Sequence, residues 1–235
     1  MQLKTTLMTL ALAAAALSAT AQEKIFKPTT GANNLEVQVN PFVSNPFQLS
    51  GNSLISGIKY RRFTSPTAAL RLTANLNYSR TSTITQDAGT GGSTQKELRD
   101  RRSSFGLVVR PGIEKHFAGT DRLSPYIGAE VALGFTTTRL VEESEEENNT
   151  VVETVVRNRN GFLLAGANAL AGVDIYLIPN LYIGTEFGFG LAYTSPFATK
   201  VKPPQGSEFE TREEKEATFS VGPYVQSAVR IGYIF

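Results

Sequence analysis

The chain has 235 residues, with 23 Lys and Arg against 21 Asp and Glu, and it contains no Cys and no Trp. This length suits one β domain of ordinary size, and the balanced charge gives no reason to expect a nucleic acid as partner. The absence of Cys excludes disulfides, thiolate metal sites, a Cys nucleophile and lipid attachment through Cys.

The N-terminal residues 1–21 have the three parts of a secretory signal peptide. Lys4 supplies the positive charge, Leu7–Leu17 forms the apolar region, and Ala19-Thr20-Ala21 is a small-x-small cleavage site. The alternative is a short membrane anchor, but the apolar run is shorter than the roughly 20 residues that a spanning helix needs. We therefore expect cleavage after Ala21, followed by a short periplasmic segment over residues 22–34.

Eight later stretches alternate between apolar and polar residues, which is the pattern of strands with one apolar face. The expected strands are Leu35–Pro41, Leu54–Phe63, Ala68–Arg80, Ser103–Phe117, Ser124–Thr137, Gly161–Ile178, Leu181–Tyr193 and Thr218–Phe235. The last stretch shows the pattern most clearly, because one set of alternate residues is almost wholly apolar and the other is small or polar. The expected connections after the second, fourth and sixth strands are short, whereas those after the third, fifth and seventh are long and polar.

This alternation of loop lengths is typical of a transmembrane barrel, which has short periplasmic turns and long outer loops. A soluble lipocalin-like barrel also has eight strands, but it would place its apolar residues inside. We therefore predict an all-β fold, an eight-stranded antiparallel up-and-down transmembrane β-barrel over residues 35–235. Without a long apolar helix, a closed barrel is the remaining way to span a membrane.

Aromatic residues on the apolar faces indicate two membrane-interface belts. The expected belt residues are Tyr78, Phe105, Phe135, Tyr193 and Phe219 at the long-loop end, and Phe117, Tyr233 and Phe235 at the short-turn end. The steps from Phe105 to Phe117 correspond to about 28 Å at the usual rise and tilt. The apolar band of such barrels is about 25 Å tall.

With these features, the chain resembles the small eight-stranded outer-membrane β-barrels, the porin-like family that includes outer-membrane proteins A and X. The resemblance covers roughly residues 35–235 and includes the terminal Tyr233-Ile234-Phe235. It implies an outer-membrane location in a Gram-negative bacterium, contact with outer-membrane lipids and lipopolysaccharide, and assembly through Tyr233 and Phe235 by the barrel-assembly machinery. We expect a monomer that lacks the peptidoglycan-binding domain of some relatives.

The polar faces carry five basic and five acidic residues, which we expect inside the barrel. They are Glu36, Lys59, Arg61, Arg71, Arg110, Glu114, Glu130, Asp174, Glu186 and Arg230. Buried charges are tolerated when they are paired, and eight strands enclose little more than side chains. We therefore predict a plugged lumen, with Arg110 opposite Glu130 and with Glu36 and Arg230 meeting where the barrel closes. The alternative is a narrow or gated ion path.

Few residues suggest chemistry. The only histidine, His116, falls at the short-turn end and is expected to be a rim residue, so we predict no enzyme, no cofactor and no metal site. The acidic run Glu142–Glu147 could attract calcium, but it lacks the spacing of a calcium loop and is better explained as a solvated loop. The run Arg99-Asp100-Arg101-Arg102 could touch lipopolysaccharide phosphates, although ion pairs to Glu97 and Asp100 are the simpler expectation.

These observations favour a non-enzymatic outer-membrane protein with an envelope-structural or surface-binding role. The alternative is a narrow pore for small solutes or ions. The ligand of the outer loops is unknown, because loop sequence varies freely on such scaffolds.

Overall fold

The computed structural model describes residues 26–39, 55–87, 96–145, 151–204, 209–212 and 216–235. The predicted signal peptide lies outside these residues. No helix in the described part of the chain is long and apolar enough to cross a membrane. The strands are β1 (Asn33–Val39), β2 (Ile55–Ser65), β3 (Ala68–Asp87), β4 (Lys96–His116), β5 (Leu123–Glu145), β6 (Val151–Arg157), β7 (Phe162–Ile178), β8 (Leu181–Pro196), β9 (Thr199–Lys202), β10 (Glu210–Arg212) and β11 (Thr218–Ile234).

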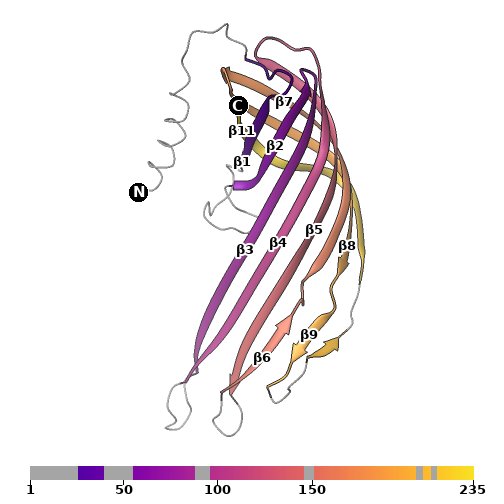
Figure 1. Ribbon diagram of the computed structural model, residues 1–235. Helices are drawn as coiled ribbons and strands as arrows, with labels where there is room; N and C mark the ends of the chain where they lie inside the picture. The colour runs from indigo at the N-terminus through magenta and orange to yellow at the C-terminus, as the bar shows by residue number, and fades with distance from the viewer. Residues whose placement is uncertain (1–25, 40–54, 88–95, 146–150, 205–208, 213–215) are drawn as a thin grey trace, which may run out of the picture.

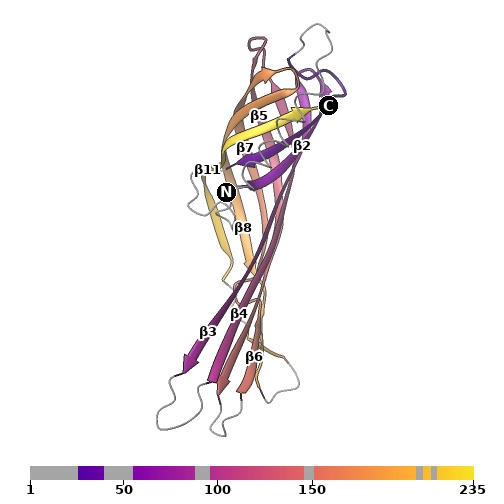
Figure 2. The ribbon, with the colours of Figure 1, turned by 90° about the vertical axis from the view of Figure 1, so that its left-hand side faces the viewer.

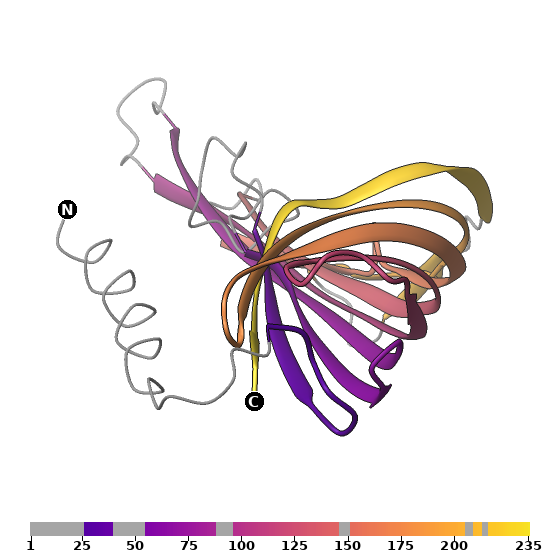
Figure 3. The same cartoon turned by 90° about the horizontal axis from the view of Figure 1, so that it is seen from above.

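Eight of these strands form a closed antiparallel ring. Its order is β1-β2-β3-β4-β5-β7-β8-β11, and β11 pairs again with β1. Seen from above, the strands curve round to bring the first and last strands together (Figure 3). The ring strands are those predicted from the alternating pattern, so the predicted eight-stranded up-and-down fold is confirmed.

The short connections lie together at one end of the ring, which also holds the C-terminus and is uppermost in Figure 1. The connection between β7 and β8 is a tight turn, in which Asn180 adopts a φ of 71°. Asn tolerates this left-handed conformation better than most residues. Phe235 and Asn33 exchange backbone hydrogen bonds of 2.8 and 3.0 Å at this end, which joins the last strand to the first.

At the other end, three strands run far beyond the expected barrel. β3 continues to Asp87, β4 begins at Lys96 and β5 continues to Glu145. Together with β6, β9 and β10 they form a sheet that extends past the ends of β1 and β2 (Figures 1 and 2). We call this part, from Arg80 on β3 across to β10, the outer sheet.

The prediction of long polar loops over residues 81–102, 138–160 and 194–217 is therefore partly wrong, because each of these ranges contains strand residues. The physical reason is that this region has polar residues on both faces. Strand prediction by apolar alternation fails there, although the Thr-rich and Val-rich runs of β3 and β6 favour extended chain.

Side-chain burial in the ring is the inverse of that in a soluble barrel. Large apolar residues on the outer surface are exposed, including Ile58 at 51%, Leu133 at 55% and Phe187 at 59%. Glu36, Lys59 and Arg61 are fully buried inside. Alternation along each strand produces this separation, because successive side chains point to opposite faces.

Candidate functional site: the charged interior

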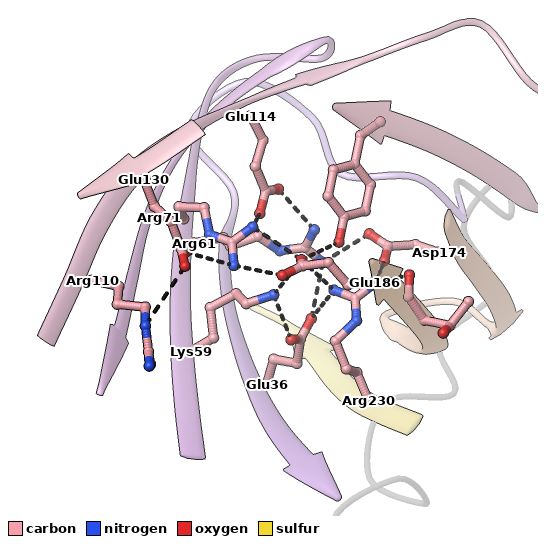
Figure 4. A network of polar contacts seen from close by, with 12 residues as sticks. Glu36, Lys59, Arg61, Arg71, Arg110, Glu114, Glu130, Asp174, Glu186 and Arg230 are labelled. Carbon is pink, nitrogen blue, oxygen red and sulfur yellow. Dashed lines mark hydrogen bonds and ion pairs between the residues drawn. The ribbon is translucent and has the colours of Figure 1, made fainter. Parts of the chain in front are cut away.

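The inward faces of the ring strands bring ten charged side chains into one cluster, which we call the lumen network (Figure 4). Its members are the ten predicted charges: Glu36, Lys59, Arg61, Arg71, Arg110, Glu114, Glu130, Asp174, Glu186 and Arg230. Nine of them are 3% exposed or less, and Arg110 is the partly exposed member, with a side-chain exposure of 20%.

Two ion pairs of the lumen network cross the full width of the ring. Arg61 on β2 approaches Asp174 on β7 at 2.8 Å, and Arg71 on β3 approaches Glu186 on β8 at 3.0 Å. Around the ring, β2 and β7 are separated by β1, β11 and β8, so they are opposite strands, and so are β3 and β8. The side chains therefore meet across the lumen and not merely along its wall.

Four donor residues surround the Glu186 carboxylate. It lies 3.1 Å from Lys59 and accepts two hydrogen bonds of 3.0 Å from Arg71. It also accepts a 2.6 Å hydrogen bond from the Tyr126 hydroxyl, and Arg230 lies 3.6 Å away. A buried carboxylate is tolerated when several donors surround it in this way.

Glu36 joins the strands at which the ring closes. Arg230 on β11 donates a 3.0 Å hydrogen bond to Glu36 on β1, so the expected contact between these two residues is present. Lys59 lies 2.9 Å from the same carboxylate, and the Tyr182 hydroxyl donates a 2.8 Å hydrogen bond to it.

The predicted register of Arg110 and Glu130 is wrong by two residues. Glu130 pairs with Gly112 on β4, and not with Arg110, because the turn between β4 and β5 is centred closer to Asp121 than to Thr120. The two side chains still approach each other at 3.8 Å. Arg110 also donates a hydrogen bond to Asn75 on β3.

Sequence reasoning missed the uncharged residues that complete the network. Tyr126, Tyr182, His116, Ser124 and Asn34 are all buried, at 4% exposure or less. They occupy inward positions by the same alternation that identified the charges, so the signal was present in the sequence. Tyr182 and Tyr176 pack with a ring separation of 5.5 Å and form, with Ile234, an apolar layer at the short-turn end.

His116 is the last residue of β4 and so lies at the short-turn end, as expected, but its side chain is buried in the network and not exposed at the rim. Its Nδ1 lies 2.9 Å from Ser124 Oγ, and its Nε2 lies 3.2 Å from Glu114. The His116 imidazole packs between the aromatic rings of Phe63 and Tyr126, with centroid separations of 5.2 and 5.0 Å. A Ser-His-Glu series can serve nucleophilic catalysis only where the serine can reach a substrate, and Ser124 is buried.

The predicted belt residues all lie on the outward surface of the ring. Phe219 and Phe235 are the most exposed of them, at 64% and 63%, and Phe135 and Tyr233 are half-buried. Tyr78 pairs with Phe105 across β3 and β4, and the Phe105 and Phe135 rings are 5.9 Å apart. The arrangement of the eight aromatic residues in two membrane-interface belts stays a prediction.

The two charged runs of the sequence meet on the outer sheet. Arg101 on β4 contacts Glu143 on β5 at 3.1 Å and Glu153 on β6 at 2.9 Å. Arg99 contacts Glu97 at 3.6 Å, as expected. The acidic run is therefore strand as far as it is described, and not the expected solvated loop; residues 146 and 147 lie outside the described residues. Among the described residues, no three His, Asp or Glu side chains are grouped as ligands of a metal ion.

Comparison with protein families gives one decisive match. Residues 43–235 match the Putative OmpA-OmpF-like porin family. The chain belongs to this family. A comparison with curated proteins gave no match. Membership in the OmpA-OmpF-like porin family identifies an outer-membrane β-barrel protein, of a family that is generally non-enzymatic.

Proposed function

We propose that this protein is a non-conducting, non-enzymatic outer-membrane barrel with an envelope-structural or surface-binding role. The observation that carries the proposal is the pair of ion bridges across the ring, Arg61 to Asp174 and Arg71 to Glu186. Both bridges lie between strands on opposite sides, so they obstruct the path that an ion would take.

Energetics support a permanently closed interior. Removing one partner of a buried ion pair costs about 3–5 kcal/mol, because the other charge is left without compensation. Opening a path along the axis would separate Arg61 from Asp174 and Arg71 from Glu186 together. If the two costs add to about 6–10 kcal/mol, the open state has a population of roughly one part in ten thousand or less, because each 1.4 kcal/mol lowers a population about tenfold.

Export and assembly follow from the ends of the chain. We propose that the signal peptide is cleaved after Ala21 and that residues 22–34 lead from the periplasm into the barrel. The β11 strand, with Tyr233 and Phe235 on its outward face, is the proposed contact for the barrel-assembly machinery. The protein is proposed to sit as a monomer among outer-membrane lipids and lipopolysaccharide.

The outer sheet is the proposed functional surface. We propose that the barrel is oriented with its short turns toward the periplasm. The outer sheet, at the opposite end of the ring (Figure 2), then projects from the cell. A projecting sheet provides a broad face for a surface ligand, whereas the buried network has no free face to offer.

A narrow pore is the second candidate function, and one observation favours it. A cavity of about 400 Å³ lies on the long-loop side of the network; its lining includes the inward residues Arg110, Asn168 and Ser220, together with the outward residues Leu191 and Val221. Water in this cavity would come close to the network from the outer side. Conduction would then require only that the ion pairs rearrange.

Planar-bilayer recording separates the two candidates. The refolded mature protein and its Arg110→Ala variant are both expected to give no stable conductance. Arg102→Ala is the matched control, because Arg102 is an exposed arginine on the same strand. A stable conductance that changes with Arg110→Ala, but not with Arg102→Ala, would establish the pore and overturn the closed barrel.

A further inference from the structure

A row of cations crosses the outer sheet directly beyond the aromatic belt. Arg80 on β3 pairs with Ser103 on β4, which pairs with Arg139 on β5. The row continues through Arg157 on β6 to Lys200 on β9. We call these five residues the cationic row. It contains four cations and no acidic residue.

The cationic row faces outward, like the membrane-facing surface below it. Arg80 follows Tyr78 by two residues and Ser103 precedes Phe105 by two, so each shares the face of a belt aromatic. Two residues correspond to about 6.6 Å along a strand, or about 5 Å along the membrane normal at the usual tilt. This height is that of the lipid headgroups, which lie just outside the hydrocarbon core.

The arrangement is unfavourable without an anion. Arg139 lies directly opposite Arg157, and Arg157 lies directly opposite Lys200. Like charges that face each other across strands destabilise a sheet. Arg157 also stacks on Phe209 at 4.6 Å, but a ring contact does not neutralise its charge.

The neighbouring acids are already occupied. Glu143 and Glu153 lie farther from the belt, and both contact Arg101 at 3.1 and 2.9 Å. Among the described residues, no ion pair to Arg80 or Arg139 is found, and both side chains are exposed. Within the described part of the chain, no acidic side chain therefore neutralises the two arginines on either side of Ser103.

The surface is hollowed at this point. A cavity of about 330 Å³ is lined by Tyr78, Arg80, Arg101, Arg102, Ser103, Arg139 and Val141, and by one acidic residue, Glu153, which is paired with Arg101. Strands lie about 4.8 Å apart, so Arg80 and Arg139 stand about 10 Å from each other with the Ser103 hydroxyl between them. Two arginines that line the same cavity as a serine hydroxyl suit a phosphate, which arginine binds through paired hydrogen bonds.

We propose that this cavity binds a phosphate group of an outer-leaflet glycolipid, with Arg80 and Arg139 as its principal ligands and Ser103 as a further donor. The inference rests on the proposed outer-membrane orientation, which places the cationic row at the outer leaflet. A lipid is the chosen occupant because Tyr78, an exposed belt residue, lines the same cavity and would contact the sugar or acyl part of the molecule.

Native mass spectrometry of the mature protein in mild detergent tests the proposal. The probes are phosphorylated lipid A, the same lipid A after removal of its phosphates, and inorganic phosphate as a competitor. We expect the phosphorylated lipid to bind preferentially and inorganic phosphate to displace it only weakly. Equal binding of the two lipids, or binding of neither, would overturn the proposal without any mutation.

Variants locate the site. Removing a cation at an anionic membrane surface costs about fivefold in affinity, so the Arg80→Gln, Arg139→Gln double variant is expected to bind phosphorylated lipid A roughly 25-fold more weakly. The matched control is Arg62→Gln with Lys115→Gln, because both are exposed outward cations at the short-turn end. An unchanged affinity in the first variant, or an equal loss in the control, would contradict the proposed site.

The two proposals fail in different ways. Heat-modifiable gel migration reports whether each variant forms the barrel, and bilayer recording reports whether the barrel conducts. A folded, non-conducting barrel that binds the two forms of lipid A equally overturns the lipid site alone. A conducting barrel that prefers phosphorylated lipid A overturns the closed lumen alone.

Discussion

Replacing Glu186 with glutamine tests the lumen network at a carboxylate that four donor residues surround. The change keeps the shape of the side chain and removes its charge. In the native barrel the carboxylate lies 3.1 Å from Lys59 and 3.0 Å from Arg71, and accepts a 2.6 Å hydrogen bond from Tyr126. Glu186→Gln leaves three buried cations, Lys59, Arg71 and Arg230, with one counter-charge fewer. It also places an amide NH2 group, which donates, where a carboxylate oxygen accepted.

The expected loss in the free energy of unfolding is about 3–5 kcal/mol, as for other buried pairs that lose one partner. This is a large part of the 5–15 kcal/mol that is typical of a domain. Glu153→Gln is the matched control, because the Glu153 side chain is 53% exposed and pairs with Arg101 at 2.9 Å. An exposed pair of this kind contributes less than about 1 kcal/mol.

Urea unfolding of the refolded variants in lipid vesicles gives the two values. The folded fraction is followed by heat-modifiable migration, and circular dichroism provides an independent measure of strand content. If Glu186→Gln and Glu153→Gln lose the same free energy, below about 1 kcal/mol, the interior is hydrated and the argument from buried charge fails.

Two further pairs of substitutions test the short-turn end of the lumen by the same unfolding assay. Tyr182→Phe is expected to cost about 1–2 kcal/mol, because its fully buried hydroxyl lies 2.8 Å from the Glu36 carboxylate, to which it donates, and 2.9 Å from the Asn34 side-chain amide. Tyr176→Phe should cost less than half of that, because its buried hydroxyl has no hydrogen-bond partner among the described residues; equal losses would contradict the assigned donor. Gly232→Ala should cost about 1–3 kcal/mol, because an added Cβ would meet the Tyr182 ring at 2.0 Å. Gly222→Ala on the same strand meets nothing within 4 Å and should be close to neutral, so a similar loss at both positions would show that Tyr182 lies elsewhere.

The ring was predictable because the membrane imposes a simple rule on it. Outward residues such as Leu133 must be apolar, and the alternation then assigns every inward residue, including Arg61 and Asp174. The ten charges of the lumen network follow from parity alone. The contact between Glu36 and Arg230 was predictable, because their strands are neighbours where the ring closes. Contacts across the ring were not, because they depend on register, and an error of two residues displaced the expected cross-strand partner of Glu130.

The outer sheet was not predictable by the same rule. Outside the membrane neither face of β3 or β6 needs to be apolar, so the alternation that marks a strand disappears after Tyr78. The inward Tyr126 and Tyr182 were missed for a related reason. Aromatic residues were assigned to the membrane belts, although alternation places these two on the polar face, where their hydroxyls donate to Glu186 and Glu36.

Single-tryptophan fluorescence tests the direction of the side chains most directly, since the chain has no native Trp. Leu163 and Leu164 are consecutive residues of β7, and Leu163 is 52% exposed while Leu164 lines the inner cavity. In vesicles with brominated acyl chains, Leu163→Trp is expected to be strongly quenched and Leu164→Trp to be protected. Quenching of Leu164→Trp with protection of Leu163→Trp would contradict the account, because the apolar rows would then face a closed interior.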